Sequence, residues 1–289
     1  MKVLVTGGAG FIGSNLVNKL IELDYQVEVI DNHLSDLGKI NKKANYHQYD
    51  LSNTNNFNQI VTILNSVDTV FHLAAKARVQ PSIEDPVGYE INNTLSTVNI
   101  LKACVDAHVR RFVYSSSSSV YGNNNSMPLK ENFKPNPLSP YGAQKYYGEI
   151  LCNTFAEVYD IETISLRYFN VYGEGQNIGG AYSLVIGIFF DQMLKEKPLT
   201  IRGDGTQKRD FTYVGDVVNA NILASKSNMV GGGEVINIGN GDNRTINQIA
   251  SLFDLEKEYI APVLEPKETL ADIKLAKDLL NWKPTTSVD

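Results

Sequence analysis

The chain has 289 residues and a net charge of −6, with 43% hydrophobic and 20% charged residues. This composition is ordinary for a soluble globular protein with a large core, and the acidic balance argues against a nucleic-acid surface. No apolar stretch approaches the length of a membrane span, and the histidines lack the spacing of a metal site. Cys104 and Cys152 fall in helical patterns, so we expect buried thiols in a reducing cytoplasm rather than a disulfide.

The chain opens with a strand, a glycine-rich turn and a helix. Residues 2–6 form a short apolar run that predicts a buried parallel strand, and residues 14–21 predict a helix. Between them, Gly7 permits a tight turn, Gly10 lets a pyrophosphate approach the backbone, and Gly13 lets the helix pack closely. Because a helix N-terminus offers unpaired N–H groups to phosphates, this stretch predicts a dinucleotide-binding turn.

A second apolar run, residues 27–30, ends at Asp31. A dinucleotide-binding unit places at this point the carboxylate that takes the adenosine ribose hydroxyls. Neither Asn32 nor His33 is the arginine or lysine that a 2′-phosphate needs. The sequence therefore predicts NAD rather than NADP as the cofactor.

Apolar runs and helical stretches then alternate through the first half of the chain. We expect strands before Asp50–Leu51 and over residues 69–73 and 112–114, and helices over 55–66 and 89–107. Arg110–Arg111, before the third of these strands, is expected to be a solvated pair. This order predicts an α/β fold, a doubly wound parallel sheet of the Rossmann type.

The second half changes character. A helix from Tyr141 to about Tyr159 and a strand over 163–168 precede shorter, glycine-rich elements, and Gly231–Gly233 is expected to be a flexible surface loop. We therefore expect an NAD-binding domain over residues 1–170. A smaller C-terminal α/β substrate lobe would span 171–289, with some segments returning to the first domain.

Candidate catalytic residues follow the third of those strands. Ser115–Ser119 stands at its carboxyl end, where ligands bind in a doubly wound sheet. Tyr141 and Lys145 lie one turn apart on one helix face, so a phenol and an ammonium can converge. A nearby ammonium stabilises a phenolate, so we expect the pKa of Tyr141 to fall toward neutrality and Tyr141 to serve as a base.

These motifs resemble a known family. The sequence over 7–13, 115–122, 141–145, 166–173 and 209–211 is similar to the extended short-chain dehydrogenases/reductases that act on nucleotide sugars. Within that family the chain looks most like the NAD-dependent 4-epimerases of UDP-glucose and UDP-N-acetylglucosamine, and the resemblance covers nearly its whole length.

The resemblance implies a role for each catalytic residue. Tyr141 takes the proton of the sugar 4-hydroxyl while C4 gives hydride to NAD, Ser117 hydrogen-bonds the same oxygen, and Lys145 holds the nicotinamide ribose and tunes Tyr141. The 4-keto sugar then turns about its phosphate link and takes the hydride back on its other face.

Cofactor and substrate contacts follow from the glycine turn and the resemblance together. The predicted cofactor contacts are Gly7, Gly10, Phe11, Ile12, Gly13, Asp31, Asn32, Asp50, Leu51, Ala74, Ala75, Asn93, Ser115, Tyr141, Lys145 and Tyr168. The predicted substrate contacts are Ser117, Tyr141, Asn170, Tyr182, Ser183, Arg209 and Thr269. Asn170 and Arg209 correspond to positions that bind the UDP diphosphate in the family. For Arg209, a surface ion pair with Asp210 is an alternative.

Absent residues narrow the reaction. Family dehydratases carry an Asp-Glu pair after the catalytic hydroxyl residue, where this chain has Ser118 and Ser119, and decarboxylases carry a glutamate where Ser119 stands. A 4-epimerase is therefore favoured. The alternatives are a nucleotide-sugar 4,6-dehydratase or decarboxylase and, in another class, a non-catalytic NAD-sensing protein.

The identity of the hexose depends on two segments. Residues 176–183 look like those of epimerases that accept N-acetylhexosamines, and the small Thr269 should leave room for an N-acetyl group. We therefore expect UDP-GlcNAc/UDP-GalNAc to be accepted, alone or with UDP-Glc/UDP-Gal. The family's usual diphosphate arginine is missing from the sequence over 262–265, and Lys267 is a candidate replacement.

The resemblance also implies a homodimer. Helices around 93–107 and 141–159 would pair with those of a second subunit in a four-helix bundle.

Overall fold

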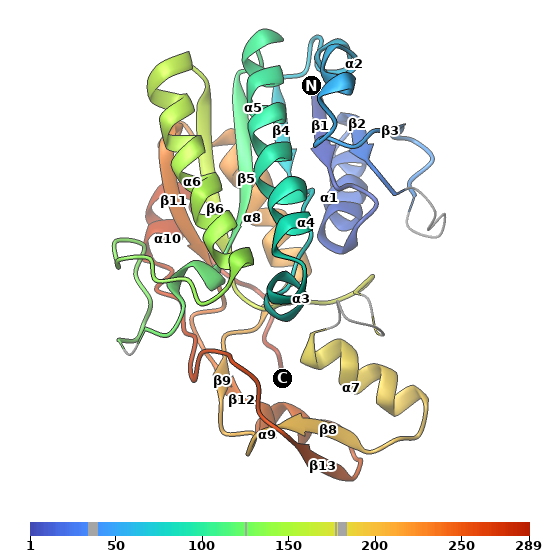
Figure 1. The fold of residues 1–289 in the computed structure, drawn as a ribbon, viewed down its shortest axis with the longest axis vertical. Helices are drawn as coiled ribbons and strands as arrows, with labels where there is room; N and C mark the ends of the chain where they lie inside the picture. Colours follow the sequence, from blue (N-terminus) through green and yellow to red (C-terminus); the bar gives the residue numbers. More distant parts are fainter. Residues whose placement is uncertain (34–39, 125, 177, 179–183) are drawn as a thin grey trace.

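A computed structural model of the chain describes residues 1–33, 40–124, 126–176, 178 and 184–289. Its centre is a seven-stranded parallel sheet in the order β11-β6-β5-β4-β1-β2-β3 (Figure 1). Its strands are β1 (Lys2–Thr6), β2 (Gln26–Asp31), β3 (Asn45–Gln48), β4 (Thr69–His72), β5 (Arg111–Ser117), β6 (Glu162–Tyr168) and β11 (Gly232–Ile238). From β1 the chain first winds outward to β3 and then returns to β4 and winds the other way. The predicted doubly wound α/β fold is confirmed.

The sheet is buried on both faces, and its central strands carry apolar side chains on each face. In β1, Val3 and Val5 pack into one core cluster and Leu4 into another on the opposite face. Alternate side chains of a strand point to opposite faces, so this division follows from the strand itself. The first cluster lies under α1 (Phe11–Glu22), α8 (Val214–Lys226) and α10 (Lys274–Leu280), and the second under α2 (Phe57–Ile63), α5 (Ser96–Asp106) and α6 (Pro140–Tyr159).

The helix expected over 89–107 is interrupted. It consists of α4 (Pro86–Glu90), a π-helical turn (Ile91–Leu95) and α5, and it follows the short α3 (Val79–Glu84). The helix expected over 55–66 is shorter, with a 3₁₀ turn at Thr54–Asn56 before α2. A second 3₁₀ turn, Ser118–Tyr121, follows β5.

Two expectations about the surface are wrong. Gly232 and Gly233 begin the edge strand β11, which pairs with β6, instead of forming a loop. Arg111 is 2% exposed: its guanidinium donates to the carbonyls of Ala224, Ser227 and Val230 and pairs with Glu162. Its charge is buried because three backbone carbonyls and one carboxylate satisfy it.

A second, smaller group of elements lies beyond the carboxyl ends of the strands (Figure 1). Ile186, Phe189, Leu199, Ile201 and Phe211 belong to its own core cluster. Its elements are β7 (Val171–Tyr172), α7 (Val185–Leu194), β8 (Leu199–Arg202), β9 (Lys208–Arg209), β10 (Thr212–Tyr213), β12 (Arg244–Thr245), α9 (Ile246–Ala250) and β13 (Lys257–Ile260). Between β10 and β12 the chain returns to the large sheet, where it forms α8 and the edge strand β11.

Cys104 and Cys152 are free and buried, as expected. Within the described residues, no helix combines the length and the apolar character needed to span a bilayer.

Candidate active site

One cavity of about 1330 Å³ runs along the carboxyl ends of the central strands and under the smaller group of elements. A single small-molecule site typically occupies ~300–1,000 Å³, so this cavity has room for more than one ligand of ordinary size. It opens at the point between β1 and β4 where the winding of the sheet reverses, the usual ligand site of such sheets. The predicted residues that line it are Gly7, Gly10, Phe11, Ile12, Gly13, Asp31, Asn32, Asp50, Leu51, Ala74, Ala75, Ser115, Ser117, Tyr141, Lys145, Tyr168, Asn170, Arg209 and Thr269.

The glycine turn has the close contacts that its pattern predicts. Gly7 has a φ of +68°, and a Cβ on Gly13 would lie 2.1 Å from the carbonyl oxygen of Gly7. Gly10 is the N-cap of α1 but supplies no side-chain cap, and no acidic residue occupies the first turn. The N–H groups at this helix start are therefore suited to an anion such as a pyrophosphate.

Asp31 ends β2 beside this turn. Its carboxylate accepts hydrogen bonds from the backbone N–H of Ala9 (3.0 Å) and of His33 (3.0 Å), which fix its position at the cavity. Asp50 is fixed in a similar way, because its carboxylate accepts from the N–H and the hydroxyl of Ser52. Both carboxylates thus have defined orientations, which suits the recognition of ribose hydroxyls.

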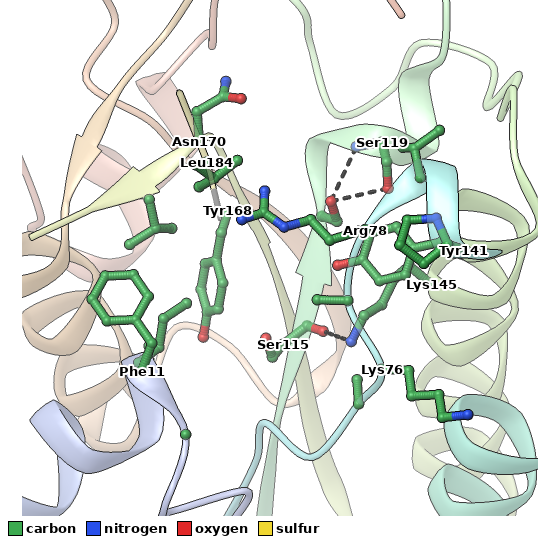
Figure 2. Close-up of a pocket in the computed structure, with 18 of the residues that line it drawn as sticks. Phe11, Lys76, Arg78, Ser115, Ser119, Tyr141, Lys145, Tyr168, Asn170 and Leu184 are labelled. Atoms are coloured by element: carbon green, nitrogen blue, oxygen red, sulfur yellow. Dashed lines mark hydrogen bonds between the residues drawn. The ribbon is translucent and has the colours of Figure 1, made fainter. Parts of the chain in front are cut away.

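Ser117, Tyr141 and Lys145 all line the cavity, and the side chains of Ser117 and Tyr141 are hydrogen-bonded. Figure 2 shows Tyr141 and Lys145 side by side. Ser117 ends β5, and its hydroxyl accepts from the N–H of Ser119 (3.2 Å) and contacts the Ser119 hydroxyl (2.9 Å). Tyr141 and Lys145 project from the first turns of α6, which Ser139 caps by accepting from the N–H of Gly142.

The pKa of Tyr141 in this site differs from the expectation. Burial raises the pKa of Tyr141, although a hydrogen bond with Ser117 and the charge of Arg78 oppose that rise. The predicted fall of the Tyr141 pKa toward neutrality is therefore wrong. The Lys145 ammonium donates to the carbonyl oxygen of Ser115 (2.7 Å) and lies 5.9 Å from the centre of the Tyr141 ring. Burial lowers the pKa of Lys145 to about 8.

Asn93 takes a place that the sequence does not reveal. It is buried in the π-helical turn, and its amide accepts from the N–H of Lys76 (2.8 Å) and donates to the Lys76 carbonyl (3.0 Å) and to Gln144 (3.0 Å). It is absent from the described lining of the cavity, where Asn92 and Ser96 stand instead. Here Asn93 positions the segment after β4, and its contact with the cofactor stays a prediction.

Asn170, Arg209 and Thr269 all line the cavity, and Asn170 contacts Thr269. The Asn170 amide donates to the carbonyl of Asp210 (2.9 Å) and to the Thr269 hydroxyl (3.4 Å). Nη2 of Arg209 lies 2.7 Å from a carboxylate oxygen of Glu265. The alternative of a surface pair with Asp210 is wrong, because Asp210 is buried and accepts from the N–H groups of Asn240, Gly241 and Ala271.

Other predicted residues lie elsewhere. Lys267 is exposed and does not belong to the described cavity lining. Tyr182 and Ser183 lie outside the described residues. The cavity also contains Lys76, Arg78, Gln80 and Arg202, which the sequence patterns do not single out. Their position directly after β4 or at the end of β8 is the signal that could have found them.

Comparison with known proteins now identifies the family. A model described as "NAD dependent epimerase/dehydratase family" matches residues 3–239. The chain belongs to this family. The predicted family and its NAD cofactor are thereby confirmed, and with them the prediction of an enzyme.

Named relatives span nearly the whole chain. The UDP-glucuronate 4-epimerase of Thermodesulfobacterium geofontis is 37% identical over 99% of this chain and 92% of its own length. The structure of a UDP-glucose 4-epimerase from Thermotoga maritima with UDP-glucose aligns with a TM-score of 0.94 at 37% identity, covering 100% and 95% of the two chains. A UDP-N-acetylglucosamine 4-epimerase from Methanobrevibacter ruminantium, in complex with UDP-N-acetylmuramic acid, gives 0.92 at 37% identity over 98% and 93%.

Proposed function

We propose that the protein is an NAD-dependent 4-epimerase of a UDP-hexose. The observation that carries the proposal is the meeting of Ser117, Tyr141 and Lys145 in a cavity that begins at the glycine turn. Ser118 and Ser119, which follow the catalytic hydroxyl in the same cavity, offer no carboxyl group to expel water. The names of the relatives favour the same reaction over dehydration, decarboxylation and non-catalytic NAD sensing.

The chain's own residues supply binding and proton transfer. NAD, when bound, provides reversible oxidation at C4 of the sugar. The glycine turn and the start of α1 would hold its pyrophosphate, and Asp31 its adenosine ribose. Tyr141 removes the proton of the 4-hydroxyl and later returns it, while Ser117 fixes the same oxygen. Lys145 would hold the nicotinamide ribose, and its positive charge would favour the phenolate of Tyr141.

The UDP half would lie against Asn170 and Arg209. A guanidinium binds phosphate oxygens through a planar fork, and Arg209 is held at the cavity by β9. The diphosphate would then replace the Glu265 carboxylate as the partner of Arg209. Accordingly, residues 1–170 would contact mainly NAD and residues 171–289 mainly the UDP-sugar, although α8 and β11 pack with the sheet.

Thr269 is proposed to determine whether an N-acetyl group fits at C2. It is 6% exposed at the cavity wall, and its hydroxyl accepts from the N–H of Asp210 and the amide of Asn170. Thr269→Tyr should lower kcat/KM for UDP-GlcNAc at least tenfold more than for UDP-Glc, because the larger ring fills the space beside C2. Steady-state kinetics on both sugars would measure it. An equal loss on both would contradict the proposal.

A homodimer is proposed from the apolar surface of two neighbouring helices. Ile91 and Leu95 of the π-helical turn and Tyr147 and Ile150 of α6 are 38–49% exposed. Isolated apolar side chains are common on surfaces, but several on adjacent helices suit a helix-bundle contact.

A cytoplasmic location also stays a prediction.

The decisive experiment is incubation of the purified protein with UDP-GlcNAc and, separately, UDP-Glc, with the anomeric protons followed by NMR. New galacto-type signals at unchanged mass would support the 4-epimerase. A product lighter by water or carbon dioxide would contradict it, as would no conversion of either sugar or of UDP-glucuronic acid after NAD is added.

A further inference from the structure

Arg78 has a backbone conformation that arginine rarely adopts. Its φ is +97° and its ψ is 142°, at the junction between the residues after β4 and the start of α3. This combination lies near a region that is accessible almost only to glycine, so a side chain there strains the backbone. Such strain persists where the surrounding structure enforces it, and it gathers at functional sites.

The neighbouring residues enforce this conformation from both sides. On the N-terminal side, Asn93 hydrogen-bonds both backbone groups of Lys76, and the Tyr89 hydroxyl donates to the carbonyl of Ala77 (2.6 Å). On the C-terminal side, the Ser82 hydroxyl accepts from the N–H of Tyr141 (3.2 Å). The segment that carries Arg78 is therefore fixed to the helices that form the catalytic wall.

The strained backbone directs a guanidinium into the cavity. Arg78 lines the same cavity as Ser117 and Tyr141, and Figure 2 shows its side chain extending from the Tyr141 side into the space toward Tyr168. Its charge lies close enough to the Tyr141 phenol to lower the pKa of that group. Burial lowers the pKa of Arg78 itself only to about 10, so the guanidinium stays positive at neutral pH.

We propose that Arg78 is a specificity residue that binds a carboxylate on the sugar, so that the preferred substrate is a UDP-hexuronic acid. The inference rests on the proposed 4-epimerase, which brings C4 to Tyr141. In a pyranose, C6 is attached to the ring carbon next to C4. A C6 carboxylate therefore comes within reach of a cation beside Tyr141 in one of the two orientations of the ring, where it can accept a forked pair of hydrogen bonds.

The diphosphate groups do not account equally well for this cation. The proposed site of the NAD pyrophosphate is the start of α1, and the proposed partner of the UDP diphosphate is Arg209, whose guanidinium already faces the Glu265 carboxylate. Arg78 instead lies beside the reacting end of the sugar. A C6 carboxylate there would form an ion pair with the guanidinium, whereas a hydroxymethyl group would offer it only a neutral contact.

The test compares UDP-glucuronic acid with UDP-glucose, which differ only at C6, in the NAD-loaded wild type, Arg78→Gln and Arg78→Lys. We expect the wild type to prefer the uronic acid. Arg78→Gln should lower the kcat/KM ratio of acid to neutral sugar roughly 30- to 1,000-fold, as for other hydrogen-bonded charge pairs. Arg78→Lys should recover only part, because an ammonium cannot form the fork. A ratio that is the same in the wild type and Arg78→Gln would overturn the proposal.

A binding measurement separates this proposal from the proposed reaction. In the Tyr141→Phe holoenzyme, which lacks the proton acceptor, calorimetry should give a lower Kd for UDP-glucuronic acid than for UDP-glucose, and Arg78→Gln in that background should remove the difference. If the wild type converts neither sugar but this difference appears, the 4-epimerase is wrong and the carboxylate site stands. Equal Kd values would overturn the carboxylate site even if the epimerase is active.

The melting temperatures of two variants test the backbone strain at Arg78 separately. Arg78→Gly and Arg78→Gln both lack the guanidinium, but only glycine relieves the strain. Arg78→Gly should therefore melt a few degrees higher than Arg78→Gln, since ~1 kcal/mol moves the Tm of a domain this large by about 2–4 °C. A lower Tm for Arg78→Gly would contradict the strain argument.

Discussion

The buried ammonium of Lys145 shows how one side chain can serve function at the expense of stability. It is 4% exposed and lies 5.1 Å from the centre of the Tyr114 ring, with the Ser115 carbonyl as its acceptor. One acceptor and a ring face replace its hydration only in part, so burial lowers its pKa from 10.5 to about 8. At ~1.36 kcal/mol per pKa unit, the charged form costs about 3 kcal/mol of folding free energy.

Lys145→Met should therefore stabilise the NAD-free protein at pH 7 while abolishing epimerisation. Allowing for the lost hydrogen bond, we expect a gain of about 1–2 kcal/mol in urea unfolding. Between pH 8 and 10.5 the unfolded chain holds a proton that the folded chain has released, so wild-type stability rises with pH through this window. The advantage of Lys145→Met should shrink there, and a variant less stable than wild type at pH 7 would refute the argument.

The glycine turn offers a matched pair of substitutions. A Cβ on Gly10 would approach only the Gly7 carbonyl oxygen at 3.2 Å, whereas on Gly13 it would lie 2.1 Å from the same atom. Gly10→Ala should keep the melting temperature of the NAD-free protein within a few degrees but weaken NAD binding at least tenfold. Gly13→Ala should reduce both. Thermal melts with and without NAD would distinguish the two, and unimpaired NAD binding in Gly10→Ala would contradict the pyrophosphate site.

Among the helices, the interrupted run from α4 to α5 has two roles. Inward, its π-helical turn directs Asn93 to the backbone of Lys76 and so holds the segment that includes Arg78. Outward, it presents Ile91 and Leu95 beside the exposed Tyr147 and Ile150 of α6. π-Helical turns are common at functional sites. Such a turn directs side chains differently from a regular α-helix.

Ile150→Glu should convert the proposed dimer into a monomer, because a charge in an apolar helix-bundle contact is costly to desolvate. Leu252→Glu is the control: this leucine is 54% exposed but lies after α9, away from those helices. Light scattering at micromolar concentration should give half the mass for Ile150→Glu alone. A monomeric wild type, or an unchanged mass for Ile150→Glu, would refute the proposed interface.

For the molecule as a whole, the sequence predicts features that depend on local spacing. The glycine turn, the serines at the end of β5 and the Tyr141–Lys145 pair each lie within one turn or one helix, so their arrangement follows from the element. Arg111 could not be placed in this way, because its acceptors at Ala224, Ser227 and Val230 are far along the chain. The position of Arg78 after β4 is visible in the sequence, but its positive φ is not, because the contacts that fix this segment come from residues farther along the chain, such as Asn93 and Tyr141.

A fragment ending at residue 170 should not fold, although it includes the predicted NAD-binding domain. It would lack β11, which pairs with β6 along the sheet edge, and α8, which covers the core cluster of Val3 and Val5. Circular dichroism and NAD titration of the fragment 1–170 should show an unfolded chain without NAD affinity. Cooperative melting with NAD binding would contradict this expectation, and the full-length chain is the positive control.

The return of the chain to the sheet at β11 also bears on protein synthesis. A ribosome releases the glycine turn first, but the edge strand that completes the sheet emerges more than two hundred residues later. During that interval the nascent chain would expose β6 as an open edge and the apolar face that α8 later covers. The sheet can therefore be completed only late in translation, and until then the growing chain would expose apolar surface of the kind that chaperones shield.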